Sequence, residues 1–325
     1  MITALALLGY AASAAWWAPA LLAPLTRRGV SVRAGLAAWL TAMASVLVSA
    51  ALAVQFSVRT VAADWPQLTQ ALCRSVAGSA CTPEVYGSVL YQAGVTVLAA
   101  SLTLAGVAAA WRYGRRVRRS RAQTRSHARA ALLVGRAIAG GSRTVMLDDP
   151  RPAAYCVAGR PAAIVVTSGA LAVLDPPQLR AVLAHEGAHL AHGHHALATV
   201  TRGLAAAFPG IPLFTRGAAE VARLTEMAAD DTAARASGRP ALVAALIAIA
   251  TGAAVSSADI PGADIAGAAV PAGAMAAASR AVPDRVERML RPSSPARSAA
   301  FTAALALAVT LLAAAPPALT LLVAG

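Results

Sequence analysis

Hydrophobic residues gather in four long runs that enclose a more polar middle region of the chain. A helix that crosses a bilayer needs about 20 mostly apolar residues, and each run reaches that length. We therefore expect three transmembrane helices early in the chain and a fourth near its end, at residues 2–23, 34–56, 88–111 and 299–324. The pair Pro316-Pro317 is expected to kink the last helix or to end its regular part.

Composition supports a membrane protein, because 58% hydrophobic residues and a mean hydropathy of +0.62 are too apolar for an ordinary soluble enzyme. The net charge of +14 comes from arginine alone, since the chain has no lysine. Basic loops stay in the cytoplasm, so the arginine-rich segments should share that side of the plasma membrane. Those segments are residues 27–33, 112–129 and 291–297.

This orientation predicts the organisation of the whole chain. The N-terminus, residues 57–87 and the C-terminus would lie outside, and the region between the third and fourth helices would be cytoplasmic. The expected parts are three transmembrane helices with an extracytoplasmic loop at 57–87 (1–111), a basic juxtamembrane segment (112–129), a cytoplasmic domain (130–298) and a fourth transmembrane helix (299–325).

The basic segment 112–129 has two interpretations. It could bind nucleic acid or a repressor, or it could anchor the chain beside the bilayer and contact anionic lipid. We favour the second, because no recognition helix or RNA-binding motif supports a nucleic-acid partner. The bilayer is therefore an expected partner, whereas the sequence does not predict an oligomeric state.

The three cysteines do not form a cysteine-based zinc site, because no Cys-x-x-Cys pair exists. Cys73 and Cys81 fall in the expected outside loop, where oxidation is possible. A disulfide between them and two free thiols are both compatible with the sequence. Cys156 would lie on the reducing side, as a thiol in the core of the domain.

Short strand patterns and longer helical patterns share the middle region. Asp175, followed by Pro176, suits the N-cap of a helix that contains the chain's histidine cluster. Residues 203–214 form either a loop on the membrane surface or a hairpin between helices, and 256–278 a loop or mobile flap. The other expected elements are strands at 143–147, 154–158 and 163–167 and helices at 170–174, 215–236 and 240–255, the last a buried core helix.

The segment from His185 to His189 reads His-Glu-x-x-His inside an apolar helical pattern. Residues four apart lie on one face of a helix, so both histidines can present a ring nitrogen to one Zn²⁺. Glu186 lies beside them, where it can act as general base toward water. This spacing is typical of zinc peptidases.

A catalytic zinc needs a third protein ligand. His195 stands ten residues after His185, but the glycine turn of the comparable three-histidine pattern is displaced by one residue, to Gly193. We favour Glu226, because Asp230 follows it on the same helix face and could orient a zinc-bound histidine.

Other polar residues near this motif have less defined expected roles. Glu220 is off the Glu226 face and is expected to be a solvated charge. His192, His194 and His195 are expected at the surface, at an interface or beside substrate. The candidates to stabilise an oxyanion are His194, Arg285 and Arg288.

With these residues in place, the chain resembles the gluzincin membrane peptidases related to HtpX, and more closely the BlaR/MecR-type signal-transducing metallopeptidases. The matching stretches are Val165–Leu171, Gln178–His189 and Glu226–Asp230. The resemblance implies a multi-pass α-helical membrane protein with a mostly helical α+β zinc peptidase domain. It also implies His185, His189 and Glu226 as zinc ligands, Glu186 as base, and pairing of substrate with the strand before the helix. We expect no counterpart of the penicillin-binding domain of those sensors after the fourth helix, and hence no direct β-lactam sensing.

The favoured hypothesis is a membrane zinc endopeptidase that cleaves a cytoplasmic or membrane-proximal protein, by resemblance a transcriptional repressor. An HtpX-like quality-control protease is the alternative within the enzyme class. A non-catalytic scaffold or receptor that kept the peptidase fold is the alternative outside it. The presence of Glu186 together with all three candidate ligands argues against the scaffold.

Overall fold

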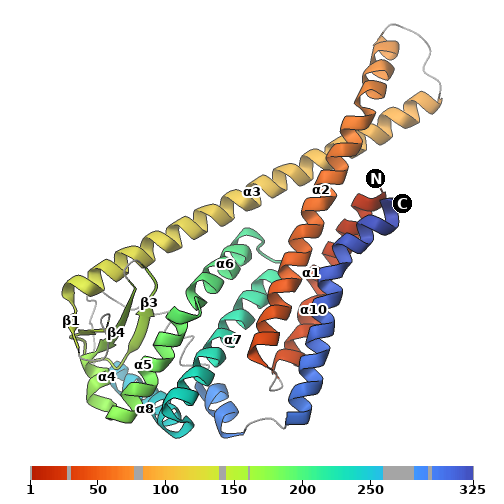
Figure 1. The fold of residues 1–325 in the computed structure, drawn as a ribbon. Coiled ribbons are helices and arrows are strands. Elements are labelled where there is room, and N and C mark those ends of the chain that lie inside the picture. The colour runs from red at the N-terminus through yellow and green to blue at the C-terminus, as the bar shows by residue number, and fades with distance from the viewer. Residues whose placement is uncertain are drawn as a thin grey trace.

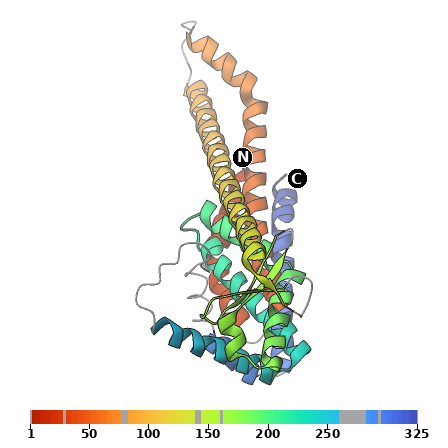
Figure 2. The same cartoon turned by 90° about the vertical axis from the view of Figure 1, so that its left-hand side faces the viewer.

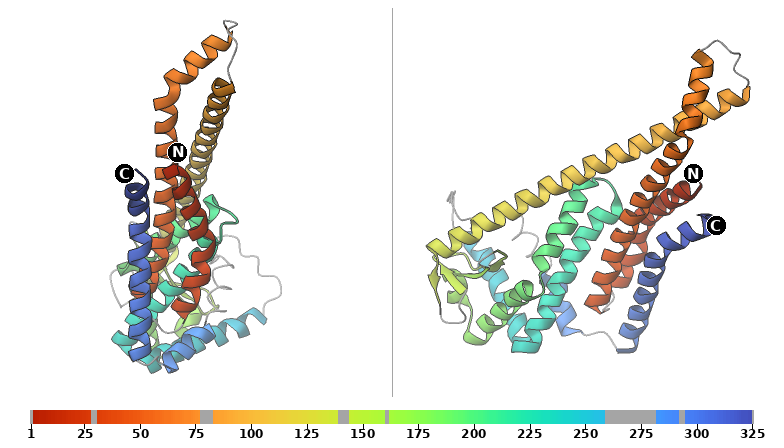
Figure 3. Two further views of the ribbon diagram at one scale, coloured as in Figure 1. Left: turned by 90° about the vertical axis from the view of Figure 1, so that its right-hand side faces the viewer. Right: turned by 45° about the horizontal axis from the view of Figure 1, so that its top comes forward.

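The computed structural model shows a bundle of long helices beside a mostly helical domain with a small sheet (Figure 1). Within the bundle, α1 (Ile2–Arg27), α2 (Val32–Val76) and α10 (Pro295–Ala324) pack against one another. The N- and C-termini lie at the same end of the bundle (Figure 3). The structure describes residues 2–27, 31–76, 83–138, 144–159, 162–258, 282–291 and 295–324.

Four of the described helices are long and apolar enough to cross a membrane. This finding agrees with the four runs seen in the sequence, whereas the side of the membrane on which each end lies stays a prediction. The candidate spans are Ile2–Thr26, Val32–Ala63, Leu90–Val134 and Ser298–Leu322.

The described part of residues 57–87 is helical, whereas its predicted position outside the membrane stays a prediction. Helix α2 continues to Val76, and α3 (Pro83–Val134) already begins seven residues later. The basic segment 112–129 is likewise part of α3, which leaves the bundle and runs over the domain to the sheet (Figures 1 and 2). The pairing of Cys73 with Cys81 lies outside the described residues, because Cys81 and the Cys73 side chain are not among them.

Helix α10 continues through Pro316 and Pro317, so of the two expected outcomes, a kink or an end of the regular helix, the second does not occur. Proline has no N–H, so Pro316 leaves the Leu312 carbonyl without its usual intrahelical donor. The Ser45 hydroxyl donates to this oxygen at 2.6 Å, and the Tyr10 hydroxyl lies 2.7 Å from Ser45 Oγ. A polar contact from α2 and α1 therefore satisfies a carbonyl that the proline pair exposes.

The domain is joined to the bundle by α7 (Pro212–Ser237), whose first half lies in the same hydrophobic core as α1, α2 and α10. Leu213 and Phe214 are buried there with Trp39 and Met43. A Cβ at Gly217 would meet the end of the Met43 side chain and the Trp39 ring, so a larger residue there would require these side chains to shift. The helix that carries Glu226 is thus fixed directly to candidate membrane spans.

The sheet has the strand order β1-β2-β4-β3, with a parallel β2–β4 pair between two antiparallel pairs. The end of α3 packs on one face through Ala128 and Ala131, while α4, α5 and α8 share a core with Val166 on the other face. Three strands match the sequence predictions to within one residue, and β1 was not expected. The strands are β1 (Arg136–Ala137), β2 (Thr144–Leu147), β3 (Ala154–Val157) and β4 (Ala163–Thr167).

The remaining helices surround the histidine motif. Residues 203–214 form the end of α6, a short turn and the start of α7, so the hairpin interpretation is the correct one. Helix α8 buries Leu242 and Ala245, as expected of a core helix. Beyond α8, the expected loop to residue 278 lies outside the described residues. These helices are α4 (Ser168–Val173), α5 (Pro176–Ala191), α6 (His194–Ala207), α8 (Arg239–Ala258) and residues 282–290.

Replacing Ser45 with alanine removes the donor to the Leu312 carbonyl. We expect Ser45→Ala to lower the free energy of unfolding by about 1 kcal/mol, the usual size of a side-chain hydrogen bond between membrane helices. Ser49→Ala is the matched control, because Ser49 is also buried one turn later and its hydroxyl has no hydrogen-bond partner among the described residues. Reversible unfolding in mixed detergent micelles measures the free energy of unfolding of the two variants. An equal decrease in both would contradict the assigned role of Ser45.

Candidate active site

A capping box fixes the start of α5, as the sequence predicted for Asp175. The Asp175 carboxylate accepts from the Gln178 backbone N–H at 2.8 Å, and the Gln178 side chain accepts from the Asp175 N–H. Pro176 occupies the first helical position. Because the cap sets where the helix begins, it also sets which face of α5 carries His185 and His189.

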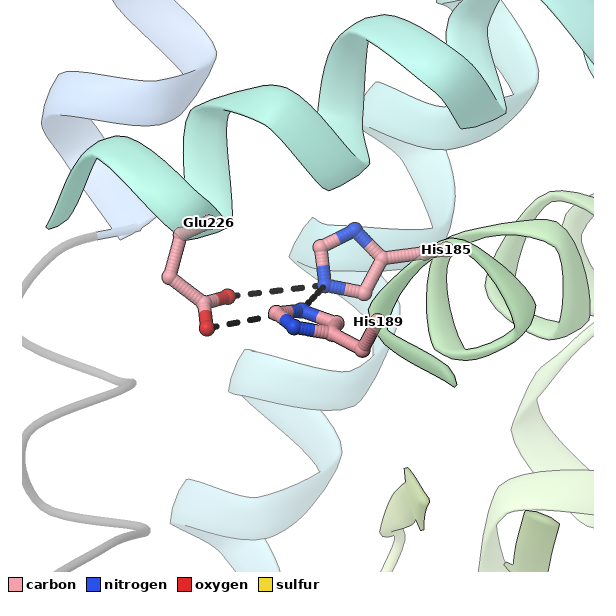
Figure 4. Close-up of side chains that lie close together, drawn as sticks. All are labelled: His185, His189 and Glu226. Atoms are coloured by element: carbon pink, nitrogen blue, oxygen red, sulfur yellow. Dashed lines mark hydrogen bonds and ion pairs between the residues drawn. The ribbon is translucent and has the colours of Figure 1, made fainter. Parts of the chain in front are cut away.

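The structure brings His185, His189 and Glu226 together, two from α5 and one from α7 (Figure 4). The two histidine Nε2 atoms lie 3.1 Å apart. The Glu226 carboxylate oxygens lie 3.4 Å from His185 Nε2 and 3.5 Å from His189 Nε2. Ligand atoms at about 2.0–2.1 Å from one tetrahedral zinc would lie about 3.3 Å apart, so the three side chains fit a zinc ion.

Electrostatics favour a cation at this position as well. Burial lowers the pKa of His185, but its contacts with Asp230 and Glu226 outweigh burial and raise the pKa to about 9. Burial raises the pKa of Glu226, yet hydrogen bonds from His185 and His189 hold it well below its ordinary value. The cluster therefore stabilises positive charge at its centre, as a divalent metal ion requires.

Asp230 lies behind His185, one turn after Glu226 on α7. Its Oδ1 atom is 3.1 Å from His185 Nδ1, although the ring N–H is not aligned for a full hydrogen bond. Arg285, from the helix at residues 282–290, donates to both Asp230 oxygens, through Nε at 2.8 Å and through Nη2. Burial raises the pKa of Asp230, but the contacts with Arg285 and His185 keep it below its ordinary value. Asp230 is 1% exposed and ionised.

His194 occupies the equivalent position behind His189. Gly193 adopts a left-handed conformation (φ 64°) between α5 and α6, and the next residue turns back toward the motif. The Nδ1 atoms of His194 and His189 lie 3.0 Å apart. Burial, together with the neighbouring rings of His189 and His192, lowers the pKa of His194 to about 4, so this ring is neutral.

His195, the alternative third ligand, is not part of the cluster. Its Nε2 lies 3.2 Å from Cys156 Sγ, on β3. The Cys156 thiol is buried, as expected, and burial together with the adjacent Glu186 carboxylate raises its pKa. Glu186, on α5, is therefore close to Cys156 on β3.

The three oxyanion candidates are all engaged elsewhere. Arg285 is 6% exposed and pairs with Asp230, while Arg288 donates to Asp231 at 2.8 Å. His194 is buried against His189, as described above.

Glu220, expected to be solvated, is instead buried and paired with Arg223 at 2.8 Å. Arg223 also donates to the Thr26 carbonyl at the end of α1. This correction has a physical reason, because the α7 face that carries Glu220 packs toward the bundle instead of solvent.

Comparison with known proteins agrees with this geometry. The model of peptidase family M48 matches residues 118–305, which is more than half of the chain and includes every candidate site residue. The chain belongs to peptidase family M48. Members of that family are zinc metalloproteases, so the fit of the three side chains to zinc has independent support.

Two relatives are each 33% identical over 84 residues: the protease HtpX homologs of Ralstonia pickettii (strain 12J) and Ralstonia nicotianae (strain ATCC BAA-1114 / GMI1000). Each match covers 25% of this chain and 29% of the relative, so the chain aligns with less than a third of those proteins. No solved structure matches the chain significantly. The closer resemblance to BlaR/MecR-type peptidases stays a prediction.

We expect Asp230→Asn to weaken zinc binding by roughly 10–100-fold, because Asp230 supports a candidate ligand from behind. It should also destabilise the protein by about 3–5 kcal/mol, because the buried Arg285 loses its main counter-charge and keeps Glu226, at 3.5 Å. Zinc titration and chemical unfolding measure the two effects. Asp231→Asn is the control, since its pair with Arg288 is more exposed and contributes about 0–1 kcal/mol. Unchanged zinc affinity in Asp230→Asn would exclude Asp230 from the site.

Proposed function

We propose that this M48 peptidase is a membrane zinc endopeptidase in which His185, His189 and Glu226 bind the metal and Glu186 is the general base. The observation that carries the proposal is the convergence of three ligand atoms from α5 and α7 at separations suited to one ion. Asp230 supports it, because its carboxylate faces the outer nitrogen of His185.

Bound zinc would act as a Lewis acid and lower the pKa of a coordinated water toward neutrality. Glu186 follows the ligand His185 directly in sequence and lies beside β3, on the side where a peptide would pass. Its carboxylate can take a proton from the attacking water and later give it to the leaving amine. Asp230 and Arg285 hold His185 in place during these proton transfers.

Strand β3 offers a place for the substrate backbone. In the described part of the sheet, β3 is an edge strand whose single partner is β4, and α5 packs against it. The family resemblance implied that substrate pairs with the strand before the His-Glu-x-x-His helix. That strand is β4, which already has β2 and β3 as partners, so the edge strand is β3 instead. A peptide that pairs with the free edge of β3 would run past Cys156 and Glu186.

The position of α7 supports a substrate close to the bilayer. Arg223 donates to the carbonyl of Thr26, the last residue of the first candidate span, at 3.2 Å. Glu226 follows Arg223 by less than one helical turn, about 4.5 Å along the axis. The metal site is thus close to the end of a span, which suits a cytoplasmic or membrane-proximal protein as substrate.

Two biological roles remain as proposals. The relatives named protease HtpX homolog support the alternative role, an HtpX-like protease for the quality control of membrane proteins. Cleavage of a transcriptional repressor rests only on the resemblance to BlaR/MecR-type peptidases. Identification of the captured substrate decides between them.

We expect Glu186→Gln to fold, to bind about one zinc per chain as in a mononuclear site, and to retain substrate without cleaving it. The amide keeps the shape of the side chain but cannot accept the proton from water. Elemental analysis gives the zinc content, and mass spectrometry identifies what co-purifies with the variant. Glu226→Ala is the comparison that should lose the zinc, and a Glu186→Gln protein that still cleaves the captured substrate would refute the mechanism.

A reporter fusion tests the predicted orientation. If the arginine-rich segments lie in the cytoplasm, a reporter joined after Arg129 should read as cytoplasmic and one joined at Ser79 as external. The reverse result would place the peptidase domain outside and would exclude a cytoplasmic substrate.

A further inference from the structure

His189 contacts a second histidine through the nitrogen that faces away from the candidate metal site. The Nδ1 atoms of His189 and His194 are 3.0 Å apart, and their rings are nearly perpendicular, at 86°. His194 is 5% exposed, so water does not readily replace this contact. Two ring nitrogens at this distance require one to donate and the other to accept, because two N–H groups or two lone pairs would repel.

The direction of this hydrogen bond decides whether His189 can bind metal. His189 Nε2 is the atom that faces His185 Nε2 and Glu226. A neutral imidazole carries one proton, so a free lone pair at Nε2 requires the proton on Nδ1. His189 must then donate from Nδ1, and His194 must accept.

We propose that His194 is a positioning residue, which accepts the hydrogen bond from His189 Nδ1 and thereby keeps His189 Nε2 available for the metal. The inference rests on the proposed function, because it assigns a role toward the same zinc ion. His194 does for His189 what Asp230 does for His185, with a neutral ring from α6 in place of a carboxylate from α7. A neutral acceptor adds no further negative charge to a site that already contains Glu186, Glu226 and Asp230.

The other two histidines of this segment do not share the role. His192 is exposed, and its Nδ1 contacts the Ala188 carbonyl at 3.0 Å. His195 contacts Cys156. Gly193 accounts for the difference. Its left-handed conformation starts α6 in a new direction, so that His194, the first residue of α6, lies against His189.

The test replaces His194 in the full-length protein in detergent with two residues of similar shape. Asparagine places an amide oxygen where the histidine has Nδ1, two bonds from Cβ, so His194→Asn can still accept the hydrogen bond. Leucine branches at the same atom and fills the same space without an acceptor. His192→Leu is the control for loss of a nearby histidine that does not contact a ligand ring.

Competition between the metal-free protein and a chelator for added zinc gives the affinity of each variant. We expect His194→Leu to bind zinc roughly 10–100-fold more weakly than the unaltered protein, the usual effect of removing the hydrogen-bond partner of a metal-ligating histidine. His194→Asn should recover most of that loss, and His192→Leu should show none. The absorption bands of bound Co²⁺ should change in His194→Leu if the ligand ring has moved. Without metal, the His194→Leu and His194→Asn proteins should unfold at the same temperature.

The outcomes distinguish this inference from the proposed function. Zinc binding by His194→Leu at the affinity of the unaltered protein would overturn the role of His194 while leaving the zinc site intact. Equal weakening in His194→Asn and His194→Leu would also overturn it, because the acceptor would then not matter. Failure of the unaltered protein to bind zinc would instead refute the proposed zinc site, and this inference with it.

Discussion

The buried ion pair between Asp230 and Arg285 is the interaction on which the site depends. Taking either charge out of water alone is costly, so each holds the other in an interior where neither would remain unpaired. The pair joins α7 to the helix at residues 282–290, and the same aspartate faces the outer nitrogen of His185. Arg285 Nη1 is also 3.5 Å from Glu226. One arginine therefore fixes both carboxylates of α7 relative to the histidines of α5.

Sequence patterns predicted the parts of the site that lie within single helices. His185 and His189 follow from a four-residue spacing, as does the placement of Glu226 and Asp230 on one face of α7. The cap at Asp175 also depends on neighbours in sequence, and it was found correctly. Hydropathy located four candidate spans, because length and composition alone define them.

The features that were missed depend on contacts between distant segments. Arg285 meets Asp230 from 55 residues away, and no local pattern in the chain identifies that partner. The sequence placed Asp230 behind a zinc-bound histidine, but it did not identify Arg285 as the second partner of that carboxylate. Glu220 appeared solvated because its burial depends on how α7 packs against the bundle. Pro316 did not end α10, because α2 supplies the donor that the proline lacks.

The two halves of the candidate metal site are held by different parts of the fold. Helix α5 carries the histidine pair and packs on β3, β4 and α8, whereas α7 carries Glu226 and packs on α1, α2 and α6 as well as on α5. The three ligand atoms meet only where these two sets of contacts are satisfied together. Since Leu213, Phe214 and Arg223 fix α7 to helices that can cross a membrane, the glutamate reaches the histidines from the side of the domain that packs on those helices. Packing against the spans is therefore a condition for assembling the site, in addition to anchoring the domain.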